Sequence, residues 1–133
     1  MKFLKRLFGI CETPQPGDPE SWSVQNKSVR ITLPRMPELN TPGSGVRLEG
    51  KGLTPRLLVL HGNDGQYHAI ANRCTHMGRR IDTIAGSNTI ECCSVSKSTF
   101  TYDGQPVGGA AKKPVQAYPV VLDEETLTIT LTN

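Results

Sequence analysis

The feature that most constrains the fold of this 133-residue chain is a two-residue alternation of apolar and polar side chains in short segments. In residues 126–132 leucine and isoleucine alternate with threonine, and residues 29–33 alternate in a similar way. A period of two places successive side chains on opposite faces of an extended strand. The pattern therefore predicts half-buried strands, and we expect an all-β fold.

The composition agrees with short strands joined by many turns. The chain has 13 glycines and 10 prolines, and only 5% of its residues are aromatic. Its length suits one domain with a single modest hydrophobic core. Further strands are expected at residues 46–48, 56–60, 66–71, 89–92, 99–102 and 119–122.

The N-terminal part has a different character. Residues 1–10 place apolar side chains opposite Lys2, Lys5 and Arg6 at helical spacing, which predicts either weak contact with a membrane surface or a partner, or a frayed terminus. Residues 11–26 are rich in proline and glycine and are expected to be a linker. We therefore divide the chain into an N-terminal segment and linker (1–27) and a folded domain (28–133).

Charge and apolar runs restrict the location and partners of the chain. Three of the 15 basic residues lie in residues 1–10, so 12 basic and 12 acidic residues remain beyond them. A near-neutral domain lacks the basic face that nucleic-acid binding requires. Residues 1–10 contain no apolar run long enough for a signal-peptide core or a membrane span, so we expect a cytoplasmic protein, peripheral to a membrane at most.

A metal-site pattern stands between the expected strands. Cys74 and His76 lie two residues apart, and Cys93 follows in a second expected loop. A thiolate and an imidazole from one loop and a thiolate from another can converge on iron if the loops lie side by side. Ser96 stands three residues after Cys93, where a second histidine ligand would be expected. His61 and His68 lack motif support, and we interpret both as structural.

With these loops in place, residues 28–132 resemble a Rieske iron–sulfur domain, whose pattern is C-x-H-x-G followed by C-P-x-H-G-x-x-F. The resemblance implies an antiparallel β-sandwich with two metal-binding loops that hold a [2Fe-2S] cluster. It implies metal ligation by Cys74, His76 and Cys93, with Ser96 at the fourth position. It also implies cofactor contacts for the other motif positions, which are Gly78, Ser98 and Phe100.

The departures from the family pattern leave three alternatives. In the first, a cluster binds with Ser96 or a water completing the second iron. In the second, the fold is a cluster-free interaction or structural module, similar to nitrite-reductase small subunits, and Cys74 and Cys93 lie close enough for a disulfide by family analogy. In the third, Cys74, His76, Cys92 and Cys93 bind zinc, although adjacent residues of a strand point to opposite faces. Otherwise Cys92 is a small core residue.

The chain shows no pattern of a catalytic site, and Asp82 and Asp103 are interpreted as turn residues. We therefore expect an electron carrier or accessory subunit rather than an enzyme. Its expected partner is a redox protein or an oxidoreductase subunit. Arg79, Arg80 and Lys97 are either solvated loop charges or a docking surface for an acidic partner.

Overall fold

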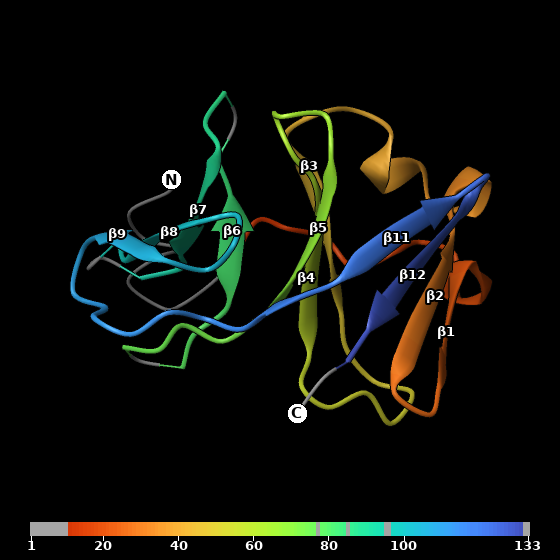
Figure 1. The fold of residues 1–133 in the computed structure, drawn as a ribbon, viewed down its shortest axis with the longest axis horizontal. Coiled ribbons are helices and arrows are strands. Elements are labelled where there is room, and N and C mark those ends of the chain that lie inside the picture. The colour runs from red at the N-terminus through yellow and green to blue at the C-terminus, as the bar shows by residue number, and fades with distance from the viewer. Residues whose placement is uncertain (1–10, 77, 85, 95–96, 132–133) are drawn as a thin grey trace.

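The computed structural model describes residues 11–76, 78–84, 86–94 and 97–131, and this part of the chain contains strands and short 3₁₀ helices but no α-helix. Three four-stranded antiparallel sheets follow one another across the molecule (Figure 1). The all-β prediction is confirmed. No helix of the described residues is both long enough and apolar enough to cross a membrane.

Each sheet joins strands from different parts of the chain. The first sheet has the order β1 (Trp22–Gln25), β2 (Ser28–Thr32), β12 (Thr126–Thr130), β11 (Val120–Asp123). The middle sheet has the order β10 (Ala117–Tyr118), β5 (Tyr67–Ala71), β4 (Leu57–His61), β3 (Ser44–Leu48). The third sheet has the order β6 (Ile81–Thr83), β7 (Thr89–Cys92), β8 (Thr99–Thr101), β9 (Pro106–Gly108). The 3₁₀ helices are Pro19–Ser21, Leu33–Arg35 and Pro37–Leu39.

The middle sheet is buried on both faces, and this produces two cores where the sequence suggested one. On β4, Leu57 and Val59 pack with residues of the first sheet, while Leu58 and Leu60 pack with residues of the third. All four side chains are fully buried. An apolar run without alternation is typical of a strand covered on both sides. The second core therefore attaches the third sheet and its loops to the rest of the molecule.

The strands expected from alternation are present, and four short or early strands are additional. β6, β9 and β10 have two or three residues each, too few to show a period. β1 lies within residues 11–26, which were expected to be a linker, because Trp22 is buried and Lys51 Nζ lies 4.3 Å from its ring centroid. β1 thus lies N-terminal to the expected boundary at residue 28, and the division of the chain into two parts stays a prediction. The amphipathic segment 1–10 lies outside the described residues.

Residues 11–14, which we define as the strap, run across the third and middle sheets at the start of the described chain (Figure 1). The backbone N–H groups of Glu12 and Thr13 each donate a hydrogen bond of 2.9 Å to Asp82 of β6. The carbonyl oxygen of Pro14 accepts from the backbone N–H of Arg47 in β3. The strap therefore connects two sheets that also share the second core.

Phe100 is a large, fully buried side chain on β8, so its substitution tests how much the second core contributes to stability. We expect Phe100→Ala to lower the free energy of unfolding by about 3–5 kcal/mol, from lost apolar burial and the cavity left behind. The exposed Val121 of edge strand β11 provides a control, and Val121→Thr should change stability by less than about 0.5 kcal/mol. Urea unfolding measures both. Equal effects would contradict the two-core description.

Candidate metal centre

The two loops of the predicted site both border the second core. The first loop (residues 72–80) connects β5 to β6, and the second loop (residues 93–98) connects β7 to β8. In the first loop the backbone N–H of Gly78 donates to the carbonyl of Cys74 at 2.7 Å, and the N–H of Cys74 donates to the carbonyl of Arg79 at 2.8 Å. Gly78 has φ +72°, a left-handed conformation that favours glycine. The loop thus closes tightly around Cys74.

Neighbouring segments hold the first loop in place. Arg56 donates from Nε to the carbonyl of Asn72 at 2.7 Å and from an η nitrogen to the carbonyl of Gly78 at 2.9 Å. The hydroxyl of Thr75 donates to the carbonyl of Lys113 at 2.7 Å. These bonds join the loop to the middle sheet on one side and to the segment after β9 on the other.

The second loop is anchored at its end by Ser98. This side chain is fully buried, and its hydroxyl oxygen accepts a 3.0 Å hydrogen bond from the backbone N–H of Ala111. Its carbonyl accepts from the N–H of Cys92 at 2.8 Å. Ser98 and Phe100, both expected at the site, therefore lie in the loop and the strand that border it. Their predicted contact with a cofactor stays a prediction.

The adjacent cysteines at the end of β7 point to opposite faces of the third sheet. Cys92 lies opposite Ile81 in the strand register and joins it in the second core. Cys74 belongs to the same core, and it is one of the neighbours that raise the pKa of the Cys92 thiol. The hydroxyl of Ser94 donates to the Cys92 sulfur at 3.4 Å. The thiol that faces Cys74 is therefore that of Cys92.

Burial keeps the Cys92 thiol protonated. It raises the pKa of the Cys92 thiol to about 11, and the neighbouring Cys74 acts in the same direction. The hydrogen bond from Ser94 and the positive charge of Arg79 act against this rise. Cys92 is thus a neutral thiol near pH 7. A metal ion bound there would have to displace its proton.

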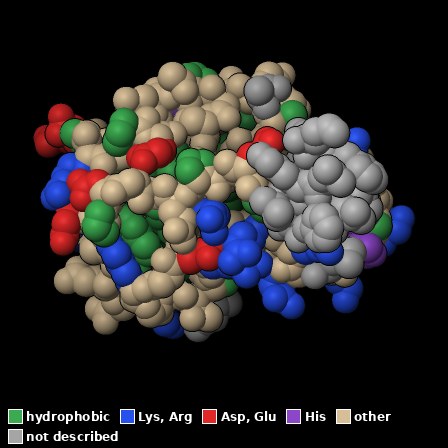
Figure 2. Space-filling view, turned by 180° about the vertical axis from the view of Figure 1, so that it is seen from behind, with side chains coloured by type: hydrophobic (Ala, Val, Ile, Leu, Met, Phe, Trp, Pro, Cys, Tyr) green, Lys and Arg blue, Asp and Glu red, His purple; other side chains and the backbone are tan. Residues whose placement is uncertain are grey.

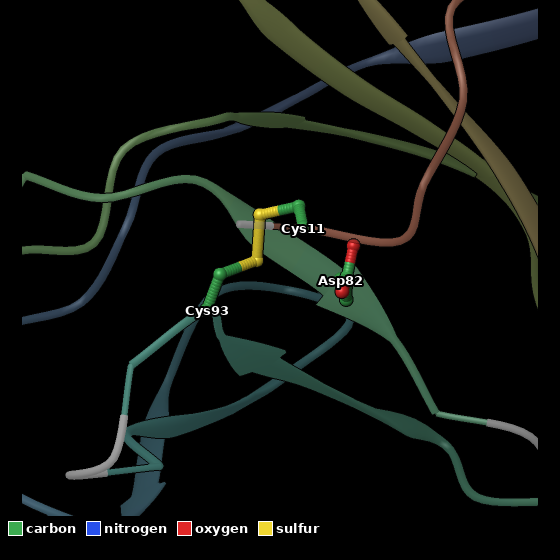
Figure 3. Close-up of side chains that lie close together, drawn as sticks. All are labelled: Cys11, Asp82 and Cys93. Atoms are coloured by element: carbon green, nitrogen blue, oxygen red, sulfur yellow. A yellow bond between two sulfur atoms is a disulfide. The ribbon is translucent and has the colours of Figure 1, made fainter. Parts of the chain in front are cut away.

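Cys93 lies on the other face of the third sheet, where it forms a disulfide with Cys11 of the strap (Figure 3). The Cα atoms of the two residues are 5.4 Å apart, and the bond joins positions separated by 82 residues. Asp82 points toward the same place from β6, and one of its carboxylate oxygens lies within 4.8 Å of both sulfurs. Asp82 is thus a buried strand residue that holds the strap, and its interpretation as a turn residue is wrong.

The disulfide changes two further expectations. The suggested Cys74–Cys93 disulfide is not present, because Cys93 is bonded to Cys11 and Cys74 is a free thiol. Disulfides persist mainly in oxidising compartments and are rare in the cytosol, so the disulfide argues against the expected cytoplasmic location. That location stays a prediction. Local sequence offered no signal for a bond between residues so far apart.

The structure does not bring the predicted ligands together in its described part. Cys74 is buried, His76 is exposed, and Cys93 is bonded to Cys11 on the opposite face from Cys92. Ser96 lies outside the described residues. Among the residues that the structure describes, Cys11, Asp82 and Cys93 alone form a group of three close enough to share a metal ion. The zinc set of Cys74, His76, Cys92 and Cys93 is therefore not assembled.

The remaining histidines have structural contacts, as expected. His61 Nδ1 lies 2.8 Å from the carbonyl oxygen of Leu39. His68 Nε2 lies 2.8 Å from a carboxylate oxygen of Asp64, and its ring stacks on Tyr102 with a centroid distance of 4.6 Å. Neither histidine contributes to the candidate centre.

Exposed basic side chains surround the loops, and we define Arg73, Lys97, Lys112 and Lys113 as the basic loop surface. In the view from behind, Lys and Arg side chains are more numerous toward the end formed by the third sheet, and Asp and Glu side chains toward the end formed by the first (Figure 2). Arg80 differs from the four, because its guanidinium binds both carboxylate oxygens of Glu49 at 2.6 and 3.0 Å. Arg80 therefore anchors the end of the first loop to the residue after β3.

The chain matches one family model and is similar in fold to solved structures. The family model of the Rieske [2Fe-2S] domain matches residues 33–119. No curated protein sequence matches the chain. The ferredoxin of carbazole 1,9a-dioxygenase from Nocardioides aromaticivorans IC177 is similar in structure, with a TM-score of 0.65 and 27% identity over 80% of this chain and 100% of that one.

Two further solved structures are similar in fold at lower identity. The ferredoxin of Sphingomonas yanoikuyae B1 has a TM-score of 0.59 and 23% identity, over 69% of this chain and 89% of that one. The plasma membrane Rieske protein of the cyanobacterium Synechocystis PCC 6803 has a TM-score of 0.52 and 20% identity, over 65% and 85%. At these identities the likeness supports the fold alone.

The disulfide should contribute measurably to stability because it closes a long loop. We expect Cys11→Ser to lower the free energy of unfolding of the oxidised chain by about 3–4 kcal/mol, mainly because the unfolded chain gains conformational freedom. Urea unfolding without reductant measures this loss. Under a reducing agent the two chains should have nearly equal stability, and equal stability without reductant would contradict the prediction.

The ion pair between Glu49 and Arg80 predicts a pH dependence. The hydrogen bond from Arg80 holds the pKa of Glu49 below its ordinary value, so this stabilisation is complete above the ordinary pKa and is lost as pH falls through the lowered one. Because both groups are partly exposed, we expect Glu49→Gln to cost about 0.5–1 kcal/mol at pH 7 and almost nothing at a pH well below the lowered pKa. Urea unfolding at both pH values checks this, with the exposed Glu20→Gln as the control. A cost that persisted at low pH would exclude a charge effect.

Proposed function

The chain belongs to the Rieske [2Fe-2S] domain family, and we propose that it is a small electron-transfer protein, either a ferredoxin-like carrier or a redox subunit of a larger system. The observation that carries this proposal is the ferredoxin of carbazole 1,9a-dioxygenase, whose whole length is covered by this chain. The family model and the ferredoxin together support a carrier rather than an enzyme.

The residues at the loops fit one half of the family's cofactor well. A buried pair of thiols, Cys74 of the first loop and Cys92 at the end of β7, is the donor set that one iron of a Rieske cluster requires. For the second iron the described residues offer His76 alone, and Ser96 stands in place of the second histidine. We propose that Cys74, His76 and a second cysteine hold the cluster, with Ser96 or water at the last position. When bound, the cluster supplies one-electron redox chemistry.

The chain's own residues would influence such a centre through hydrogen bonds. Ser94 already donates to the Cys92 sulfur, and hydrogen bonds to ligand sulfurs tune reduction potentials. Phe100 offers no hydroxyl donor. This is consistent with a low-potential, ferredoxin-like member.

We further propose that a redox partner docks at the basic loop surface. Its four side chains are exposed and flank the loops that hold Cys74 and His76. Complementary charge raises the rate of encounter between proteins and orients them. A partner with an acidic face around its redox centre fits this surface. A role for residues 1–10 in membrane or partner contact stays a separate proposal.

A cluster-free module of the same fold is the second candidate. It is favoured by one specific observation, the single imidazole that the described loops offer, because Rieske clusters use two. In that case the loops and the basic loop surface serve protein interaction alone.

Metal analysis distinguishes the two candidates. For protein expressed and purified anaerobically, we expect about two iron and about two acid-labile sulfide per chain, with a visible spectrum that bleaches on reduction. His76→Ala should lower the iron content, while the control His68→Ala should leave it unchanged. A folded, colourless chain without iron would contradict electron transfer by a cluster and leave the interaction module.

A further inference from the structure

The structure assigns the second cysteine ligand of the centre to Cys92, the residue before the position that the family motif designates, and assigns Cys93 to the disulfide with Cys11. This assignment rests on the proposed function, since it concerns which thiols hold the cluster. It departs from the motif, in which Cys93 would be the ligand.

The first argument is the direction of the side chains. Cys92 and Cys93 are adjacent residues at the end of a strand, so their side chains must leave on opposite faces. Cys92 is fully buried in the second core, together with Cys74 and with Ile81 of the neighbouring strand. Cys93 faces the strap and is bonded to Cys11. Only one of the two adjacent thiols can therefore face Cys74.

The second argument is the contact between the thiols. Cys74 of the first loop and Cys92 at the end of β7 are both buried in the second core, which brings two thiols together as two cysteine ligands of one iron require. Ser94, two residues after Cys92 on the same face, adds a donor to its sulfur. No comparable contact joins Cys74 to Cys93 among the described residues.

The third argument is that Cys93 is held in place by independent contacts. Its backbone N–H donates to the carbonyl of Arg80 at 2.9 Å and extends the ladder between β6 and β7. Asp82 on the same face accepts three hydrogen bonds from the strap, from the N–H of Glu12 and from the N–H and hydroxyl of Thr13. To reach Cys74, Cys93 would have to break its disulfide and reverse the register of the strand end. The disulfide and a bound cluster are thus compatible.

Cysteine trapping on the unmodified chain gives the sharpest test. Protein loaded anaerobically with ferrous iron and sulfide is denatured in an alkylating reagent without a reducing agent, and its peptides are identified by mass spectrometry. We expect alkylation of Cys74 and Cys92 and an intact Cys11–Cys93 disulfide in the iron-containing fraction. Alkylation of Cys11 and Cys93 in that fraction would overturn the assignment.

Matched variants provide the second readout, with iron and sulfide content measured alongside the far-ultraviolet circular dichroism that reports folding. The double variant Cys11→Ser/Cys93→Ser should keep the wild-type iron content. In Cys92→Ser the iron content should fall at least about tenfold. If Cys92→Ser keeps its iron and the double variant loses it, the assignment is wrong while the electron-transfer proposal stands. If the folded wild-type chain takes up no iron, both the assignment of Cys92 and the electron-transfer proposal are wrong.

Discussion

The alternation of side chains along an extended strand is the constraint on which the candidate centre depends. At the end of β7 it sends Cys92 into the second core and Cys93 to the face that carries the strap. A shift of one residue in the pairing with β6 would exchange the two thiols. The pairing of Ile81 with Cys92 therefore decides which sulfur meets Cys74 and which meets Cys11. A structural disulfide and a metal centre can thus occupy opposite faces of one small sheet.

The middle sheet positions that small sheet relative to the rest of the molecule. Because β4 is apolar on both faces, it packs against the first sheet and the third at once. The strap adds a connection on the far face, through Asp82 and the disulfide. The loops are therefore held between a core and a cross-link. Such support suits a site in which two thiols must meet in a fixed geometry.

Much of the fold was predictable, because long strands carry a visible period. Residues 29–33 and 126–132 showed alternation, and β2 and β12 lie there. β6, β9 and β10, with two or three residues each, were missed, since so few positions cannot display a period, and β1 was hidden in a segment rich in proline and glycine. The candidate site was found by motif in part: Cys74 and Ser98 do lie at the loops. The interpretation of Cys92 as a small core residue is confirmed, and it agrees with the same alternation followed from Ile90 to Cys92.

The sequence by itself determined the longer strands, the family and the two loops, because these depend on spacing within short stretches of chain. Tertiary structure alone decided that Cys11 bonds to Cys93 and that Asp82 holds the strap. It also decided that the Cys92 thiol faces Cys74. The reason is physical: periodicity is a local property, whereas contact between residues 82 positions apart depends on how sheets stack and which strand faces meet.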